Sequence, residues 1–227
     1  MGNKIGSPKP GMAKVLVIIG LALISLSLVF TMSCSSSEPT TTTPTTTTLW
    51  TFDTDPVGGL PQGATVFSGN WLVRAESDTP SALNALCQTG TATFPAMTLS
   101  DAVYTDVLVS TRFKPISGSV DRAAGIIFRV QDENNYYILR ANALENNVDI
   151  RKYVNGRRIT LKIESIEVLA GQWQELRVEV VGNQIKGFLN GQLVVETSDD
   201  TFQSGKVGLW TKADSVTCFD DVEVQAL

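Results

Sequence analysis

The stretch from residue 121 to residue 158, DRAAGIIFRVQDENNYYILRANALENNVDIRKYVNGRR, decides the fold class. It contains three apolar segments separated by short polar ones: Ala124 to Val130, Tyr136 to Ala143 and Asn147 to Val154. Each segment is rich in β-branched and aromatic residues that alternate with a period of two, which is typical of β-strands. Asn155-Gly156 then predicts a tight hairpin turn, because both central residues of a type I′ turn need positive φ.

The same pattern continues along the chain. Six further segments alternate in this way: Val103 to Phe113, Trp173 to Val181, Ile185 to Asn190, Gln192 to Thr197, Gly205 to Trp210 and Val222 to Ala226. Asn190-Gly191 predicts a second tight turn, and no segment carries a helical stripe. Many short strands joined by tight turns predict an all-β domain, a two-sheet jelly-roll sandwich.

The N-terminal residues differ from this domain in composition. Three lysines precede an uncharged apolar run at residues 15–30, and Ser33 and Cys34 follow it. A basic segment, an apolar run and small residues at a cleavage point predict that residues 1–34 are an export signal. The end of the run resembles a bacterial lipoprotein signal in which Cys34 is lipidated, although Thr31 stands where an aliphatic residue is usual. The alternative is an uncleaved membrane anchor.

Residues 35–48 are rich in Ser, Thr and Pro and contain no apolar side chain, so we expect a disordered linker. Residues 49–227 then form one domain of ordinary size. The expected location is the bacterial cell envelope. There the domain is anchored to the membrane and faces the periplasm or the exterior.

Composition excludes several kinds of site. The chain contains no histidine, which removes Ser–His and Cys–His nucleophile pairs. Removal of residues 1–33 takes three of the 18 basic residues and none of the 23 acidic ones, which leaves a net charge of −8. An acidic domain without a basic run argues against nucleic acid as a partner. In an exported protein, Cys87 and Cys218 either form a disulfide or remain as two thiols.

Strand parity separates two faces in the opening stretch. Tyr137, Leu139 and Ala141 share one face of the second segment, and Val148 and Ile150 share one face of the third. We expect both faces to enter the core. Arg140 lies on the other face with Tyr136 and Asn142, and by the same parity Trp210 faces outward with Lys212. We expect this second face to meet solvent, so that replacing Arg140 by alanine weakens ligand binding and changes stability little.

Three stretches resemble the concanavalin A-like lectin/glucanase superfamily, and within it the 3-keto-disaccharide hydrolase-like domain, also described as family 16 glycoside hydrolase-like. They are RAAGIIFRVQDENNYYILRANALENNVDIRKYVNGRR, GQWQELRVEVVGNQIKGFLNGQLV and GKVGLWTKADSVTCFDDVEV. The resemblance implies a jelly roll that binds or processes carbohydrate on one sheet. The acidic motif E-x-D-x-(x)-E of true family 16 enzymes is absent, so no catalytic residue carries over.

These observations lead to a ranked set of hypotheses. The first is an envelope-tethered, lectin-like domain whose ligand-binding residues are Arg129, Tyr136, Arg140, Asn142, Arg151, Trp210 and Lys212. The alternatives are an exported glycoside hydrolase that uses Asp or Glu groups, and a structural sandwich that mediates protein contacts. No cofactor is required, and Asp53 and Asp221 are candidate ligands for a structural calcium ion.

Overall fold

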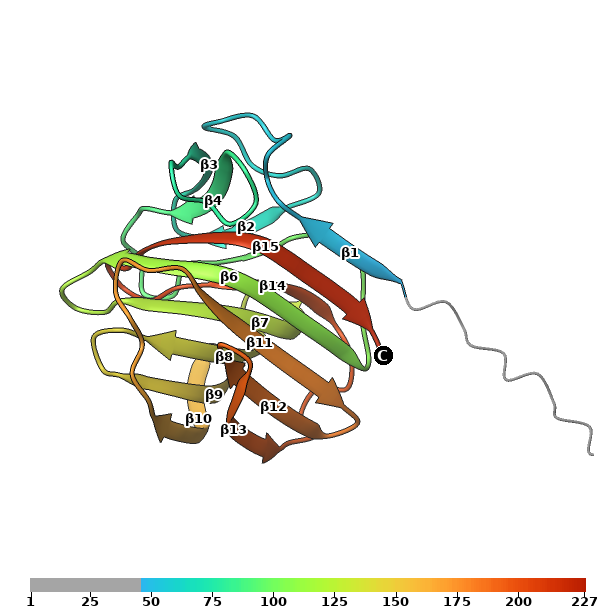
Figure 1. Cartoon of the computed structure of the whole chain (residues 1–227). Coiled ribbons are helices and arrows are strands. Elements are labelled where there is room, and N and C mark those ends of the chain that lie inside the picture. The colour runs from blue at the N-terminus through green and yellow to red at the C-terminus, as the bar shows by residue number, and fades with distance from the viewer. Residues whose placement is uncertain (1–45) are drawn as a thin grey trace, which may run out of the picture. The chain divides into compact units, whose positions relative to one another are not determined.

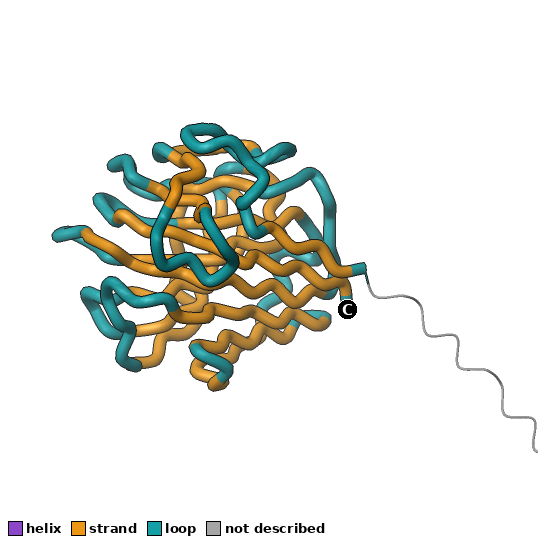
Figure 2. Tube along the Cα trace, turned by 45° about the horizontal axis from the view of Figure 1, so that its top comes forward, coloured by secondary structure: helices purple, strands orange, loops and turns teal. Residues whose placement is uncertain are grey.

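The computed structural model describes residues 46–227, and these contain fifteen β-strands and no helix (Figure 2). The all-β prediction is confirmed. Within this range no helix is long and apolar enough to cross a membrane. The apolar run at residues 15–30 and the proposed lipidation site at Cys34 lie outside the described residues, as does the linker up to residue 45.

The strands form two antiparallel sheets (Figure 1). The eight-stranded sheet has the order β13 (Gln192–Ser198), β12 (Gln184–Leu189), β11 (Gln174–Val181), β6 (Val107–Ser117), β15 (Val216–Ala226), β4 (Asn84–Gln88) and β3 (Trp71–Ala75), and β1 (Thr47–Trp50) pairs with β15. The seven-stranded sheet has the order β10 (Arg157–Ser165), β9 (Asn147–Val154), β8 (Asn135–Asn142), β7 (Ala123–Asp132), β14 (Lys206–Trp210), β5 (Ala96–Thr98) and β2 (Thr65–Ser68).

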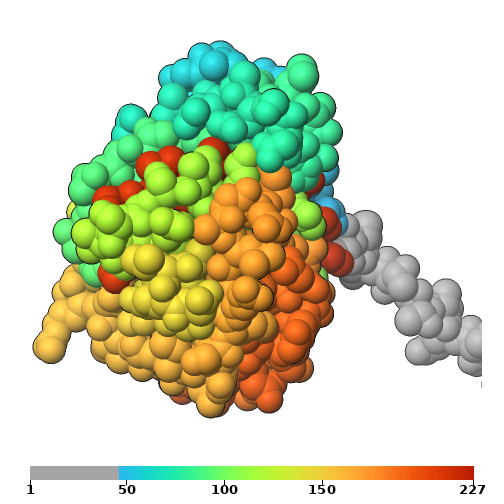
Figure 3. Space-filling model, turned by 60° about the vertical axis from the view of Figure 1, so that its left-hand side comes forward, coloured from blue at the N-terminus to red at the C-terminus, as the bar shows by residue number. Residues whose placement is uncertain are grey.

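Strands from both ends of the domain lie together in each sheet. In the eight-stranded sheet β15 pairs with β4 and β6, which Figure 3 shows as red atoms between teal and green ones. In the seven-stranded sheet β14 joins β7 to β5. Because so many contacts are distant in sequence, the fold depends on the whole domain rather than on local hairpins.

The main core lies between the two sheets. Tyr137, Leu139 and Ala141 of β8 enter it and are fully buried. Val148 and Ile150 enter it from β9. The parity prediction for these two strands is therefore confirmed.

The two asparagine–glycine turns are also confirmed. Asn155 and Gly156 have φ angles of 49° and 77°, and Asn190 and Gly191 have the same values. The first turn joins β9 to β10, and the second joins β12 to β13.

The sequence pattern misses six strands, namely β1 to β5 and β10. The first five have only three to five residues, too few for a convincing alternation. Strand β9 ends at Val154 as predicted, but β10, which follows it, carries charges at several positions and reads as a solvated loop. Strand β1 begins at Thr47, two residues before the expected domain boundary, because threonine pairs well along the edge of a sheet.

Cys87 and Cys218 form a disulfide bond. They are direct partners in the register of β4 and β15, and both are fully buried. Of the two alternatives left open by the sequence, the disulfide is confirmed. The bond closes a loop between residues 131 positions apart, so it restricts the unfolded chain strongly.

Candidate functional site

The outer face of the seven-stranded sheet, opposite the main core, carries a second apolar cluster. It contains Tyr136, Ile138 and Trp210, and half-buried Phe94 and Tyr153 pack against it. The Phe94 ring stacks on Trp210 with ring centroids 5.8 Å apart and meets Tyr153 edge-on at 5.5 Å. A loop before β5 therefore covers part of a sheet face that strand parity assigned to solvent.

The expected exposure of Tyr136 and Trp210 is wrong. Both lie on the predicted face, but their exposed fractions are only 1% and 0%. Trp210 fits because its partner in β7 is Gly125, where a Cβ atom would lie 3.1 Å from the indole ring. Burial raises the pKa of the Tyr136 hydroxyl, and the neighbouring Tyr153 raises it further. Covering by the Phe94 loop is a tertiary effect that alternation cannot reveal.

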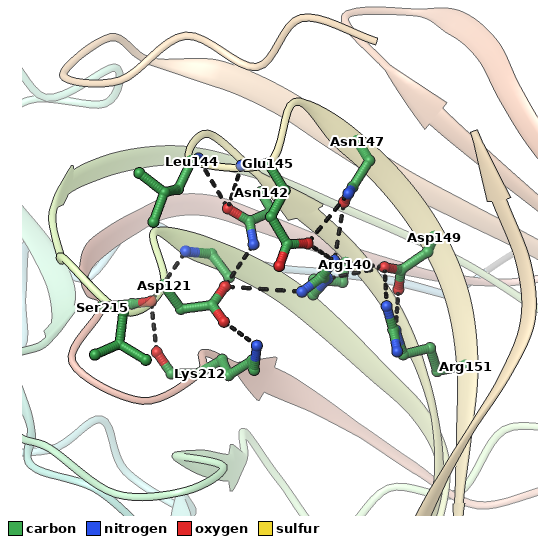
Figure 4. Close-up of polar contacts among 12 residues, drawn as sticks. Asp121, Arg140, Asn142, Leu144, Glu145, Asn147, Asp149, Arg151, Lys212 and Ser215 are labelled. Carbon is green, nitrogen blue, oxygen red and sulfur yellow. Dashed lines mark hydrogen bonds and ion pairs between the residues drawn. The ribbon is translucent and has the colours of Figure 1, made fainter. Parts of the chain in front are cut away.

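Beside this aromatic surface lies a network that we call the Arg140 cluster (Figure 4). It consists of Asp121, Arg140, Asn142, Glu145, Asn147, Asp149, Arg151 and Lys212. At its centre the Arg140 guanidinium donates to Asp149 at 2.9 Å, to Glu145 at 2.7 Å and to Asn147 at 2.9 Å. Arg140 and Asp149 face each other across β8 and β9, which places the ion pair inside one sheet.

Two further cations flank the centre. Arg151 donates to both oxygens of Asp149, at 2.7 and 2.8 Å. On the other side Lys212, just beyond β14, forms an ion pair with the buried carboxylate of Asp121. Figure 4 shows this pair together with the amide of Asn142, which donates to the same aspartate.

The hypothesis that Arg140 belongs to an open solvent face is wrong. Its exposed fraction is 1%, and Asn142 is fully buried. The side chains do lie on the face that parity predicts, opposite Leu139 and Ala141. They can be buried because neighbouring carboxylates and amides on the same sheet face form hydrogen bonds and ion pairs with them, as buried polar and charged groups require.

Arg129 is separate from this group. It has a φ of 48° at a β-bulge in β7, and a bulge breaks the alternation of side chains. Its guanidinium donates to the backbone carbonyls of Thr105, Phe202 and Gly182, and it is 1% exposed. The predicted placement of Arg129 with the other arginines is therefore wrong, and its contacts are those of a buried structural residue.

Two pockets adjoin Phe94 on this face. The first, which we call the Tyr153 pocket, has a volume of about 440 Å³ and is lined by Phe67, Ser68, Ala92, Thr93, Phe94, Ala96, Glu133, Asn134, Tyr136 and Tyr153. The second, the Arg158 pocket, has a volume of about 490 Å³ and is lined by Thr91, Ala92, Thr93, Phe94, Arg158, Lys212 and Ala213. Of the predicted binding residues, Tyr136 and Lys212 line these pockets.

Sequence reasoning missed Phe94 and Arg158. The Arg158 guanidinium lies over the Phe94 ring, 4.8 Å from its centroid. Arg158 is the register partner of Tyr153, and Tyr153 is that of Tyr136, so the three side chains form a row across β10, β9 and β8. Recognising β10 as a strand would have placed Arg158 on this face.

The charges of the site hold Glu145 ionised. Burial raises the pKa of this carboxyl, but hydrogen bonds from Asn147 and Arg140 outweigh that effect and lower it. The Glu145 side chain is 45% exposed, whereas Asp121 and Asp149 are fully buried. Glu145 is thus the carboxylate of the cluster that a ligand can reach.

The candidate calcium ligands lie elsewhere, near the start of β4 and within β15. One Asp53 oxygen accepts hydrogen bonds from the backbone amides of Leu83 and Asn84. Burial raises the pKa of Asp221; Arg112 opposes this rise, and Asp53 adds to it. Across residues 46–227 the single group of three potential metal ligands is Glu76 with the two disulfide cysteines, so calcium binding at Asp53 and Asp221 stays a prediction.

Solved structures share this architecture. The carbohydrate-binding module CBM66 from Bacillus subtilis is 22% identical, with a TM-score of 0.61 over 71% of this chain and 94% of that one. A β-glucanase from Bacillus licheniformis is 15% identical, with a TM-score of 0.52 over 80% of this chain and 98% of that one. A galectin-like protein of unknown function from Bacillus subtilis is 12% identical, with a TM-score of 0.53 over 71% and 88%. At these identities the likeness establishes the fold, and the predicted jelly roll is confirmed.

Comparison with curated proteins gave no match. A family model does match, over residues 68–225, which include the Arg140 cluster, the Arg158 pocket and every residue of the Tyr153 pocket except Phe67. The chain therefore belongs to the family described as the 3-keto-alpha-glucoside-1,2-lyase-like domain.

Proposed function

We propose that the domain binds carbohydrate on the outer face of the seven-stranded sheet, in the two pockets that meet at Phe94. The observation that carries this proposal is the half-buried Phe94 ring, which borders both pockets and has hydrogen-bonding side chains around it. Aromatic rings offer flat apolar area to the C–H faces of sugars at low entropic cost. Asn134, Thr93 and Lys212 supply polar groups for hydroxyls.

The experiment is a glycan-array screen of the purified domain, followed by titration calorimetry on the hits. Phe94→Ala should weaken binding of any hit about tenfold or more, because stacking area and pocket shape are both lost. Phe202→Ala is the matched control, since Phe202 is also half-buried but packs on Tyr137, away from the pockets. Equal loss in both variants would show that the effect is one of stability, and the proposal would fail.

Elimination from a 3-keto-α-glucoside, the reaction in the family's description, is the second candidate. It is favoured by Glu145, a carboxylate beside Arg140 whose side chain is 45% exposed and can therefore be reached by a substrate. As the base, Glu145 would take the C2 hydrogen, which the C3 carbonyl acidifies. The C–H electron pair would form the enolate, and collapse of the enolate would form the C1=C2 double bond as the C1–O bond breaks. The leaving alkoxide would take back the proton that Glu145 has accepted. Lys212, whose positive charge acts on Glu145, would stabilise the enolate.

This candidate is tested with a nitrophenyl 3-keto-α-glucoside, whose cleavage releases coloured nitrophenolate. Activity in the wild type that is lost in Glu145→Gln supports an enzyme. Sugar binding without release supports the lectin-like function. Hydrolysis by paired carboxylates is less well supported, because Asp121 and Asp149 are fully buried and engaged in ion pairs.

The third possibility, a sandwich that only mediates protein contacts, requires that no glycan binds in the screen.

For location, we propose that Cys34 is lipidated and tethers the domain to a bacterial envelope, on the basis of the sequence alone. Cys34→Ala should move the protein from the membrane fraction to the soluble fraction. Retention in the membrane fraction would instead indicate that residues 15–30 act as an uncleaved anchor.

A further inference from the structure

The two pockets that meet at Phe94 differ in charge. The Arg158 pocket is lined by two cations, Arg158 and Lys212, and by no acidic side chain. The Tyr153 pocket is lined by Glu133 and no cation. This contrast arises in a domain that is acidic in composition, so it reflects local placement rather than an excess of basic residues.

Arg158 keeps unused hydrogen-bonding capacity. Its Nη1 atom is shielded from solvent and has no hydrogen-bond partner. Within residues 46–227, no carboxylate forms an ion pair with it, although the other arginines of this face, Arg140 and Arg151, are both paired. A shielded cationic donor without a partner is costly, and such groups are rare unless a ligand or water meets them.

The nearby carboxylates cannot fill this role, because each is already engaged. Asp149 accepts from Arg140 and Arg151, and Asp121 pairs with Lys212. Glu145 accepts from Arg140 and Asn147. Together, the cluster and the Arg158 pocket contain three carboxylates and one more cation than carboxylates, which leaves one positive charge unbalanced. The cations are Arg140, Arg151, Arg158 and Lys212, and the carboxylates are Asp121, Glu145 and Asp149.

The electrostatic environment of Arg158 agrees with this excess. Burial lowers the pKa of its guanidinium, and the positive charges of Arg151 and Arg140 lower it further. Asp149 and Asp121 act in the opposite direction but do not cancel these effects. An anion in the pocket would relieve both the desolvation and the repulsion.

We propose that the Arg158 pocket holds a sugar bearing a singly charged oxyanion, a uronate carboxylate or a sulfate ester, while the Tyr153 pocket holds a neutral neighbouring sugar. The proposal rests on the carbohydrate-binding function inferred above and specifies its ligand class. The Arg158 guanidinium lies over the Phe94 ring and lines the pocket, and arginine donates to planar acidic groups from N–H groups in its own plane. Lys212 adds a second positive charge from the segment that follows β14.

The test measures binding of two matched pairs of probes by titration calorimetry. They are galacturonate oligosaccharides with the same oligosaccharides as neutral methyl esters, and sulfated galactan oligosaccharides with the same oligosaccharides after desulfation, which are neutral. Wild type should bind a charged probe at least tenfold more tightly than its neutral counterpart, and rising salt should weaken that preference. Comparing the two families of charged probe shows whether carboxylate or sulfate is the preferred group.

Arg158→Gln should weaken binding of the preferred charged probe about tenfold to a hundredfold, the loss expected for a charged hydrogen bond, and should leave neutral probes unchanged. Arg158→Lys should recover part of the affinity. Arg157→Gln is the control, because it removes the same charge from the exposed neighbouring residue, whose side chain alternates to the other side of β10.

The outcomes separate this inference from the function on which it rests. If neutral and charged probes bind equally well, or if Arg157→Gln and Arg158→Gln act alike, the inference is overturned and carbohydrate binding stands. If none of these probes binds but the array yields a neutral glycan, the inference is overturned and carbohydrate binding still stands. If no glycan binds at all, the proposed function fails with it. Thermal melting of each variant shows whether a loss of binding reflects unfolding.

Discussion

Replacing Arg140 by alanine should destabilise the domain strongly, because the structure places this guanidinium at the centre of a buried network. The change removes donors to Asp149, Glu145 and Asn147. Breaking a buried ion pair by removing one partner costs about 3–5 kcal/mol in free energy of unfolding. We expect the lower end, about 3 kcal/mol, since Asp149 keeps both hydrogen bonds from Arg151.

For a domain of this size, 1 kcal/mol shifts the melting temperature by about 2–4 °C, so Arg140→Ala should lower it by about 6–12 °C. Differential scanning calorimetry at pH 7 measures this shift. Arg74→Ala is the control. Arg74 is also ion-paired, to Glu76, but its side chain is 41% exposed, and such pairs contribute about 0–1 kcal/mol at most. A shift below about 2 °C for Arg140→Ala would refute the reasoning and restore the view of Arg140 as a surface residue.

Four further predictions follow from particular contacts. Replacing Cys87 and Cys218 by alanine should lower the free energy of unfolding by about 2–5 kcal/mol, measured by urea denaturation, and an unchanged midpoint would mean that the disulfide does not constrain the unfolded chain. Burial raises the pKa of Asp199, but hydrogen bonds from Lys152, Thr201 and Tyr137 outweigh it and lower the pKa. The stability that this carboxylate provides should therefore be present above its unfolded pKa of about 3.9 and lost as the pH falls, and Asp199→Asn should flatten that acid limb of the stability curve. If Asp53 and Asp221 bind calcium, millimolar Ca²⁺ should raise the melting temperature of wild type but not of Asp221→Asn; no rise in wild type would reject the site. Gly125→Ala should lower the melting temperature and disturb binding at the Phe94 pockets, because the added Cβ meets the Trp210 ring at 3.1 Å; wild-type melting and affinity in this variant would show that the ring moves aside freely.

The sequence by itself determined the fold class and much of the strand arrangement. Alternation in β8 and β9 placed Leu139 and Ile150 in the core, and Asn155-Gly156 located the turn after β9. These features are local, since side-chain period and turn chemistry follow from neighbouring residues. Composition was enough to exclude histidine chemistry, because the chain contains no histidine.

Only the tertiary structure decided how exposed to solvent each sheet face is and which residues contact one another on it. Phe94 reaches the outer face of the seven-stranded sheet from a distant loop and covers Trp210, a contact that no local pattern encodes. The bulge at Arg129 reversed the parity of that strand, and the short charged strand β10 brought Arg158 next to Tyr153. Asp121, which also pairs with Arg140, and its partner Lys212 join the cluster from other parts of the chain. Alternation states which side of a sheet a side chain occupies, whereas the covering of that side depends on long-range packing.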